Sequence, residues 1–261
     1  MDLVLFEKLG AIASITFNNP KALNAINEKM ATQFKDCLQD CADDRAIRCV
    51  IVKGAGRAFM AGGDLKHFYD NLEDIEEVVG SLIEVYHECI LLMASMEKPI
   101  VTGVHGAVAG GGIGMALVGD YIIAADTAQF TMAYTGIGTS PDGGSTYLLP
   151  RLIGRRAALE MSLLNKPVEA ERALALGMVN EVVSESDFEE ALQKTAGRLA
   201  SGAAKAMGNA KRLINESLES ESLEAHLARE KQLFLTCAIT DDFKEGLAAF
   251  FEKRKPDFGK E

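Results

Sequence analysis

Residues 100–119 read IVTGVHGAVAGGGIGMALVG, and this stretch constrains the fold. It holds no Asp, Glu, Lys or Arg, so its charge alone would allow a membrane span. It also holds seven glycines, and glycine at that density breaks a lone spanning helix. The stretch therefore predicts a buried strand, a glycine-rich turn and a tightly packed helix.

A second glycine turn precedes it. Residues 57–65 read RAFMAGGDL and follow a predicted strand over 47–52. Each turn lies where a strand gives way to a helix, and glycine there lets backbone N–H groups approach a ligand closely. Two N–H groups aimed at one oxygen would form an oxyanion hole, and helix dipoles would add to its positive potential. Either turn taken alone is more typical of a plain tight turn.

The rest of the chain fits an α/β fold class with two regions. Periodicity predicts two short strands on either side of Gly10, then helices over 26–40 and 81–96 and strands over 100–104, 120–125 and 129–132. Helical patterns dominate the last third, where Ser186 to Glu189 has the spacing of a capping box. We predict a core domain over 1–190 and a helical region over 191–261.

Composition excludes several classes of protein. The 261 residues include 27 Lys and Arg against 38 Asp and Glu, a formal net charge of −11. That balance argues against nucleic-acid partners and against binding to anionic membranes. Five cysteines form no CxxC pair and predict reduced thiols and a cytoplasmic location, and the charged first ten residues lack the apolar region of a signal peptide. The four histidines are scattered, so we expect no metal site and no serine-hydrolase triad.

Six stretches follow one another along nearly the whole chain: NNPKALNA (18–25), FMAGGDL (59–65), KPI (98–100) leading to GGG (110–112), PDGGS (141–145), ALALGMV (173–179) and FFEKR (250–254). In this order they resemble the crotonase superfamily, also called the enoyl-CoA hydratase/isomerase family. The resemblance implies a spiral core of ββα turns with a C-terminal helical trimerisation region. It also implies a homotrimer or a dimer of trimers, and acyl-CoA thioester substrates whose coenzyme A is part of the substrate, with no separate cofactor.

The resemblance also implies roles for individual residues. The N–H groups of Gly63 and Gly111 would hold the thioester oxygen, as the two glycine turns suggest independently. Lys21 and Lys253 would contact the phosphates or adenine of coenzyme A, with Phe250 against the ligand. Further positions of the same binding site are Ala22, Ala61, Asp64, Leu65, Lys66 and Tyr134. Asp64 more often caps the following helix, and Lys66 fits a solvated helix position equally well.

Two departures from the family pattern weaken the case for a hydratase. Hydratases of the family use two catalytic glutamates to activate water, and these positions are Gly114 and Tyr134 here. Neither residue can replace a carboxylate at neutral pH, so hydration by that route is doubtful. Tyr134 either donates a hydrogen bond into the acyl pocket or lines it as an apolar wall, and we favour the wall.

Asp142 is the candidate replacement for the lost carboxylates. Some family isomerases have a P-D-x-G stretch here whose aspartate shuttles a proton, and YLLPRLIG (147–154) is closer to those isomerases. One carboxylate beside an oxyanion hole suffices for a 1,3 proton transfer. We therefore predict an enoyl-CoA isomerase with Asp142, Gly63 and Gly111 as its catalytic groups. The alternatives are a hydratase, an aspartate-dependent aromatic acyl-CoA dehalogenase, a non-catalytic acyl-CoA-binding protein, and a simple turn role for Asp142 as a helix cap.

Overall fold

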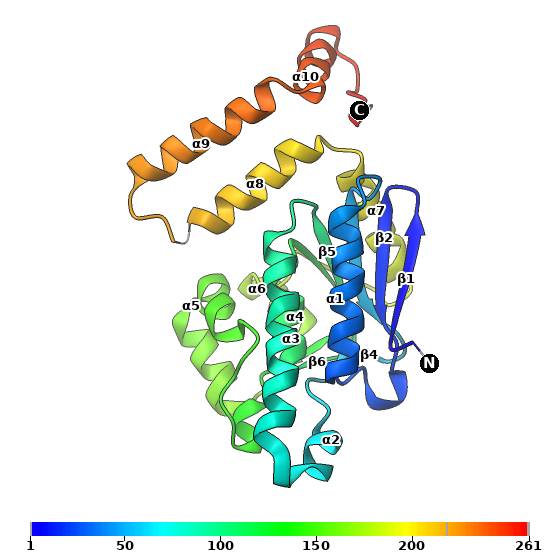
Figure 1. The fold of residues 1–261 in the computed structure, drawn as a ribbon, viewed down its shortest axis with the longest axis vertical. Helices are drawn as coiled ribbons and strands as arrows, with labels where there is room; N and C mark the ends of the chain where they lie inside the picture. Colours follow the sequence, from blue (N-terminus) through cyan, green and yellow to red (C-terminus); the bar gives the residue numbers. More distant parts are fainter. Residues whose placement is uncertain (1, 218, 260–261) are drawn as a thin grey trace.

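The computed structural model describes residues 2–217 and 219–259. Its core contains a six-stranded and a four-stranded sheet, surrounded by helices (Figure 1). The first sheet has the order β1 (Val4–Leu9), β2 (Ile12–Phe17), β3 (Cys49–Gly54), β5 (Ile100–Val104), β7 (Tyr121–Ala125) and β10 (Glu181–Val183). The second has the order β4 (Ala58–Met60), β6 (Ala107–Ala109), β8 (Gln129–Thr131) and β9 (Val168–Glu169).

The first sheet is covered on both faces. β2, β3, β5, β7 and β10 run parallel, and successive side chains in a strand point to opposite faces. Val50 and Val52 join the cluster under α1 (Glu28–Asp43) and α3 (Ile75–Ser95), whereas Cys49 and Ile51 join the cluster under α7 (Phe188–Ala200). Burial on both faces explains why these strands read as continuous apolar runs.

The predicted elements agree closely with the observed ones, and the α/β fold class is confirmed. The strand predicted over 100–104 is β5, and the long helices begin and end within a few residues of their predicted bounds, except that α3 starts six residues earlier, at Ile75. The prediction missed β4 and β6, each three residues long, inside the two stretches interpreted as turns. These two strands pair in parallel and so hold the glycine turns that follow them side by side.

The capping box predicted at residues 186–189 is wrong. α7 begins at Phe188 after Asp187, and no side chain caps its N-terminus. Glu189 instead forms an ion pair with Lys53 on β3, with 2.6 Å between Nζ and Oε2. This tertiary contact takes the carboxylate away from the helix start. The boundary predicted between residues 190 and 191 falls within α7, so the helices that stand apart from the core begin with α8 (Ala204–Ser217).

One stretch, Leu72–Ser95, is long and apolar enough to cross a membrane by length and composition alone. It comprises η2 (Leu72–Asp74) and α3, which lies alongside α1 in Figure 1. Four side chains of α3 are buried in the core of the protein: Leu82, Tyr86, Cys89 and Met93. One face of this helix therefore packs into the core of the protein.

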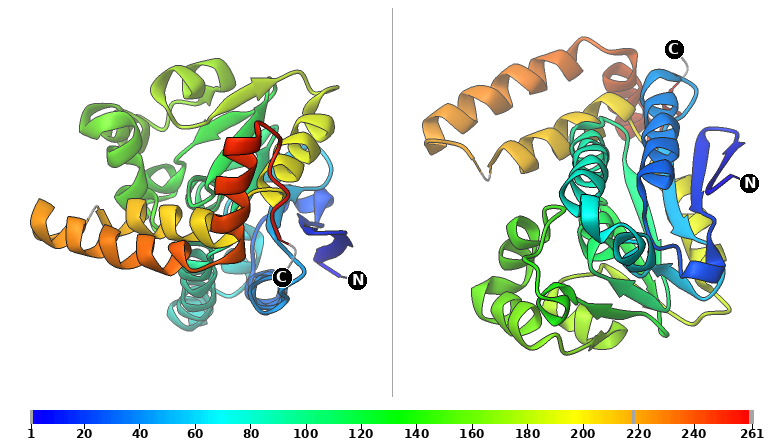
Figure 2. Two further views of the ribbon diagram at one scale, coloured as in Figure 1. Left: turned by 90° about the horizontal axis from the view of Figure 1, so that it is seen from above. Right: turned by 60° about the horizontal axis from the view of Figure 1, so that its bottom comes forward.

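The last three helices form an arm beyond the core (Figures 1 and 2). α8 crosses the end of the sheet, and α9 (Leu223–Ala238) and α10 (Asp241–Glu252) follow it. Lys211 of α8 anchors the arm, because its Nζ lies 2.9 Å from Oδ2 of Asp120, whose side chain is 25% exposed. Burial raises the pKa of Asp120, and the Lys211 charge opposes that shift.

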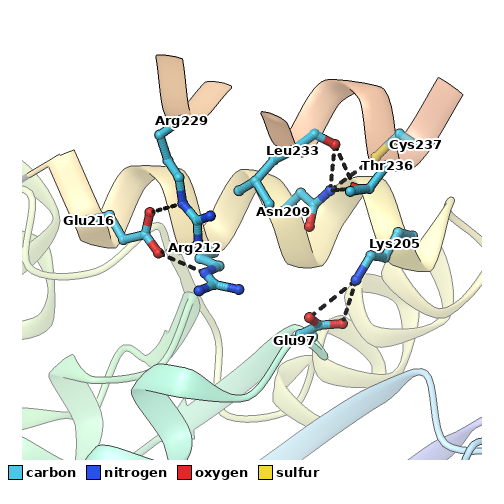
Figure 3. A network of polar contacts seen from close by, with 9 residues as sticks. All are labelled: Glu97, Lys205, Asn209, Arg212, Glu216, Arg229, Leu233, Thr236 and Cys237. Atoms are coloured by element: carbon cyan, nitrogen blue, oxygen red, sulfur yellow. Dashed lines mark hydrogen bonds and ion pairs between the residues drawn. The ribbon is translucent and has the colours of Figure 1, made fainter. Parts of the chain in front are cut away.

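Asn209 joins α8 to α9 (Figure 3). The side chain is 5% exposed, and its Nδ2 donates to the Leu233 carbonyl and to Thr236 Oγ1, both at 3.0 Å. Glu216 adds a second connection through Arg229, which donates to both carboxylate oxygens. The Arg229 and Arg212 guanidinium groups lower the pKa of Glu216 to about 2, so this connection persists through the ordinary pH range.

We predict that Asn209→Ala destabilises the protein by about 1–3 kcal/mol, because buried acceptors on α9 lose their donor. Urea unfolding measures the change. Asn215→Ala is the matched control: this exposed α8 residue makes one bond, to the Ala94 carbonyl at 3.2 Å, and its loss should cost about 0.5 kcal/mol or less. Equal effects of the two variants would contradict the role assigned to Asn209.

Candidate active site

The two glycine turns touch each other through their backbones. A Cβ placed on Gly62 would lie 3.2 Å from the Ala109 carbonyl oxygen, and one on Gly110 would lie 3.3 Å from Gly62 Cα. Both glycines also have positive φ, +97° and +50°, which disfavours any side chain there. The residues that follow them, Gly63 and Gly111, therefore begin their segments next to each other.

Gly63 and Gly111 each present an unused N–H group. Around Gly63, the Ile26 N–H donates to the Gly62 carbonyl and the Asp64 N–H donates to the Ile26 carbonyl. These bonds use the groups on either side of Gly63, and its own N–H donates to no acceptor within residues 2–217 and 219–259. The same holds for Gly111, the first residue of α4 (Gly111–Leu117). Two adjacent free donors are what an oxyanion hole requires.

The first turn is held by the loop that carries the NNPKALNA motif. Asn24 is fully buried, and its Nδ2 donates to the Ala58 carbonyl at 2.8 Å and to the Phe59 carbonyl at 3.2 Å. The Leu23 carbonyl accepts from the Ala61 N–H at 3.0 Å. Lys21 and Ala22 lie in the short helix η1 (Pro20–Ala22) of this loop. The loop that contains Lys21 is thus bonded to the turn that ends in Gly63 through Leu23 and Asn24.

Asp142 is held by a hydrogen bond from Tyr134. The Tyr134 hydroxyl donates to Asp142 Oδ1 at 2.6 Å, so the favoured interpretation of Tyr134 as an apolar wall is wrong. Burial, with the nearby Asp142 charge, raises the pKa of Tyr134 far above its usual range. The phenol therefore stays protonated and acts as a donor. Ala133, immediately before it, has a left-handed backbone with φ +62°, a strained conformation for a residue with a side chain.

The backbone of the same loop is fixed at Ser145. This residue is fully buried, and its Oγ donates to the Asp142 carbonyl at 2.8 Å. α5 (Ser145–Leu164) begins there, with Gly144 at its cap position and no side chain capping it. The alternative interpretation of Asp142 as a helix cap is therefore wrong. Its carboxylate, 26% exposed, remains available for chemistry.

The loop backbone fills the place of a side chain at position 114. A Cβ on Gly114 would lie 2.1 Å from the Gly143 carbonyl oxygen, which no real structure tolerates. Gly143 has φ +61°, and a Cβ on it would lie 2.3 Å from the Tyr86 ring. Packing therefore requires glycine at position 114, because the Gly143 backbone lies against α4 where a side chain at that position would project.

His87 is a member of the site that the sequence analysis missed. Its Nε2 lies 3.9 Å from Asp142 Oδ2, the oxygen not used by Tyr134. The side chain is 48% exposed, as expected for a helix surface, so periodicity alone assigned it no role. Only the tertiary position of the Asp142 loop against α3 reveals the contact.

The other residues predicted for the binding site lie either near the Gly63 turn or at the far end of the molecule. Asp64 caps α2 (Leu65–Asp70) by accepting from the His67 N–H at 3.1 Å, and Lys66 pairs with Asp70 at 2.7 Å on the surface. Ala61 and the half-exposed Leu65 flank the Gly63 turn. Phe250 and Lys253 lie at the end of α10, at the opposite end of the molecule from α2 (Figure 1), so one chain does not bring them to this site.

The site has no donor set for a resident metal. In the part of the chain that the structure describes, no group of three or more His, Cys, Asp or Glu side chains is placed to hold a metal ion. The arrangement offers two free N–H donors, one oriented carboxylate and a nearby imidazole. Such a set polarises a carbonyl and moves a proton beside it.

Comparison with known proteins yields consistent matches. A family profile described as enoyl-CoA hydratase/isomerase matches residues 7–261. The 1,2-epoxyphenylacetyl-CoA isomerase of Escherichia coli K12 is 35% identical over 99% of this chain and 98% of its own length. The crotonyl-CoA hydratase of Syntrophomonas wolfei is 34% identical over 98% and 97%. A crystal structure of an enoyl-CoA hydratase from Polaromonas sp. JS666 has a TM-score of 0.93, with 33% identity over 97% of this chain and 98% of that one.

We predict that Gly114→Ala destabilises the protein by about 1–3 kcal/mol, because the added methyl group must displace the Gly143 backbone. Gly197→Ala in α7 is the control: no atom lies within 4 Å of the added Cβ, and alanine there should stabilise the helix by about 0.5–1 kcal/mol. Urea unfolding compares the two. A Gly114→Ala protein as stable as the wild type would show that the loop is not packed as described.

Proposed function

The chain belongs to the enoyl-CoA hydratase/isomerase family, and we propose that it is an enoyl-CoA isomerase that moves a double bond by 1,3 proton transfer. Members of the family process acyl-CoA substrates, and relatives of this chain are named as both isomerase and hydratase. The observation that carries the proposal is Asp142: it is one oriented carboxylate, and its own loop occupies the space beside Gly114.

The proposed reaction starts from a 3-enoyl-CoA. The thioester oxygen accepts hydrogen bonds from the N–H groups of Gly63 and Gly111, which stabilises negative charge on that oxygen. Asp142 takes a proton from C2, and the electrons of the C–H bond pass into a dienolate. The same carboxyl group returns the proton to C4, so the double bond moves from C3–C4 to C2–C3 and becomes conjugated with the thioester. One acid–base group suffices because the proton leaves and returns on one face.

Tyr134 orients this carboxylate. Its hydrogen bond engages Oδ1, which leaves Oδ2 as the oxygen that carries the proton. Water addition needs a second group to hold and activate the water, and the hydratase positions hold Gly114 and Tyr134 here. A glutamate introduced at position 114 would meet the Gly143 carbonyl before it reached the substrate. Gly114→Glu alone should therefore not create a hydratase.

A second candidate function is favoured by one observation, the position of His87. With its imidazole 3.9 Å from Asp142 Oδ2, the pair is suited to covalent catalysis on a halogenated aromatic acyl-CoA. Asp142 would attack the ring carbon, halide would leave, and an aryl ester would form on the carboxyl group. Water deprotonated by His87 would then hydrolyse that ester. Neither isomerisation nor dehalogenation requires a second carboxylate. The substrate that the protein accepts therefore distinguishes the two reactions.

We further propose that the protein works as a trimer or a dimer of trimers. The arm exposes large apolar side chains, with Phe234 63%, Ile239 81%, Phe250 77% and Phe251 78% exposed. Such a surface is costly in a lone chain. Phe250 and Lys253 would then contact coenzyme A bound to a neighbouring subunit. We also propose that the cysteines stay reduced in the cytoplasm, since all five are free and burial raises the pKa of Cys49 to about 12.

We predict that the wild type converts 3-enoyl-CoA to 2-enoyl-CoA and hydrates 2-enoyl-CoA poorly. Asp142→Asn keeps the shape and removes the base, so isomerisation should fall about 100-fold or more. Mass spectrometry and absorbance of the conjugated product measure both reactions. Rapid hydration of 2-enoyl-CoA with Asp142→Asn fully active would contradict the mechanism. Halide release from a halogenated aromatic acyl-CoA offered separately, with an ester on Asp142, would instead identify the dehalogenase.

Light scattering of the purified protein should give at least three times the 28.1 kDa mass of one chain. Phe250→Asp and Phe251→Asp together should lower that mass, because charge on the exposed end of α10 opposes apolar contact between copies. Leu5→Asp, a partly exposed position on the edge strand β1, serves as the control. A monodisperse single chain at micromolar concentration would contradict the proposed assembly.

A further inference from the structure

Tyr86 contacts both parts of the site, the α4 segment that contains Gly111 and the loop that contains Asp142. It lies on α3 and is 3% exposed, and its hydroxyl donates to the Gly111 carbonyl oxygen at 2.5 Å. Gly111 is the first residue of α4, so this bond reaches the helix at its N-terminus. The Tyr86 hydroxyl therefore contacts the first turn of α4 at the residue that presents the free N–H.

The ring of the same tyrosine supports the Asp142 loop. A Cβ on Gly143 would lie 2.3 Å from Tyr86 Cε1, and one on Gly114 would lie 3.1 Å from the Tyr86 hydroxyl oxygen. These distances mean that only glycine allows the loop and α4 to lie so close to the ring. One side chain thus contacts both the segment that carries the Gly111 donor and the loop that carries Asp142.

The hydroxyl is a permanent donor. Burial raises the pKa of Tyr86 far above its usual range, and the Asp142 charge adds to the increase. If the hydroxyl were removed, the buried Gly111 carbonyl would lose this donor. The backbone at Gly111 would then be free to shift, and the direction of its N–H group would shift with it.

We propose that Tyr86 is a positioning residue, which sets the direction of the Gly111 N–H relative to the Asp142 carboxylate. It touches neither the thioester oxygen nor the transferred proton in this role and acts through Gly111 and Gly143. The proposal rests on the oxyanion hole of the proposed function. It goes beyond that function because it assigns the alignment of donor and base to a side chain outside the reacting groups.

The test is Tyr86→Phe, which keeps the ring and removes only the hydroxyl. The probe is crotonyl-CoA labelled with carbon-13 at the thioester carbonyl, whose stretching frequency falls when an oxyanion hole polarises it. Difference infrared spectra of the bound probe should show a smaller fall in the variant than in the wild type. The kcat for 3-enoyl-CoA should drop about tenfold or more, with KM changed much less, because the lost alignment matters most in the transition state.

Two variants separate positioning from general structural effects. Tyr134→Phe removes the donor to Asp142 and should lower kcat while leaving the carbonyl frequency of the bound probe unchanged. Tyr121→Phe alters a tyrosine packed on the α7 side of the sheet and should change neither measurement.

A Tyr86→Phe protein with the wild-type carbonyl frequency would overturn the Tyr86 proposal and leave the proposed function intact. Equal frequency changes in Tyr86→Phe and Tyr121→Phe would overturn it as well, since the effect would then be general. A wild type that does not shift the carbonyl at all would overturn both proposals, because no oxyanion hole would exist to be aligned.

Discussion

Close contact between the backbones of two glycine turns is the constraint on which the rest of this structure depends. A Cβ on Gly106 would lie 2.0 Å from the Arg57 carbonyl, and one on Gly112 would lie 2.4 Å from the Met60 carbonyl. No side chain fits where Gly106 meets Arg57 just before β6 and β4, or where Gly112 of α4 meets the end of β4, so the chain must use glycine. The same closeness brings the N–H groups of Gly63 and Gly111 together with no protein acceptor among the described residues. The glycines of the two turns are therefore needed both for close backbone packing and for the two free N–H donors.

The loop over α4 links the departures from the hydratase pattern. Position 114 lacks a carboxylate because the Gly143 carbonyl occupies the space that its side chain would need. The loop that brings this carbonyl also brings Asp142, and Tyr134 fixes the direction of the new carboxylate. The glycine at position 114 and the position of the Asp142 carboxylate are thus parts of one arrangement of this loop.

Local sequence signals predicted most of the elements and the two glycine turns, whereas the role of Asp142 rests on the family resemblance and stays a prediction. Continuous apolar runs identify strands such as β5, and the glycine clusters identify the turns because glycine has no substitute there. Strands β4 and β6 escaped prediction because three residues are too few to show a period. The hydrogen bonds of Tyr134 and Tyr86 and the contact of His87 escaped prediction because each depends on how α3, α4 and the Asp142 loop meet in space. The capping-box prediction failed for the same reason, because Glu189 forms an ion pair with Lys53 on β3, a strand far away in the sequence.

The central claim, that one carboxylate moves a proton between two carbons beside the oxyanion hole, is tested most directly by isotope transfer. The substrate is a 3-enoyl-CoA carrying two deuterium atoms at C2, and mass spectrometry locates the label in the product of the first turnovers in ordinary water. We predict that part of the 2-enoyl-CoA carries deuterium at C4, because Asp142 returns the deuteron that it removed from C2. Product with no deuterium at C4 from the earliest turnovers, or a 3-hydroxyacyl-CoA in its place, would contradict it.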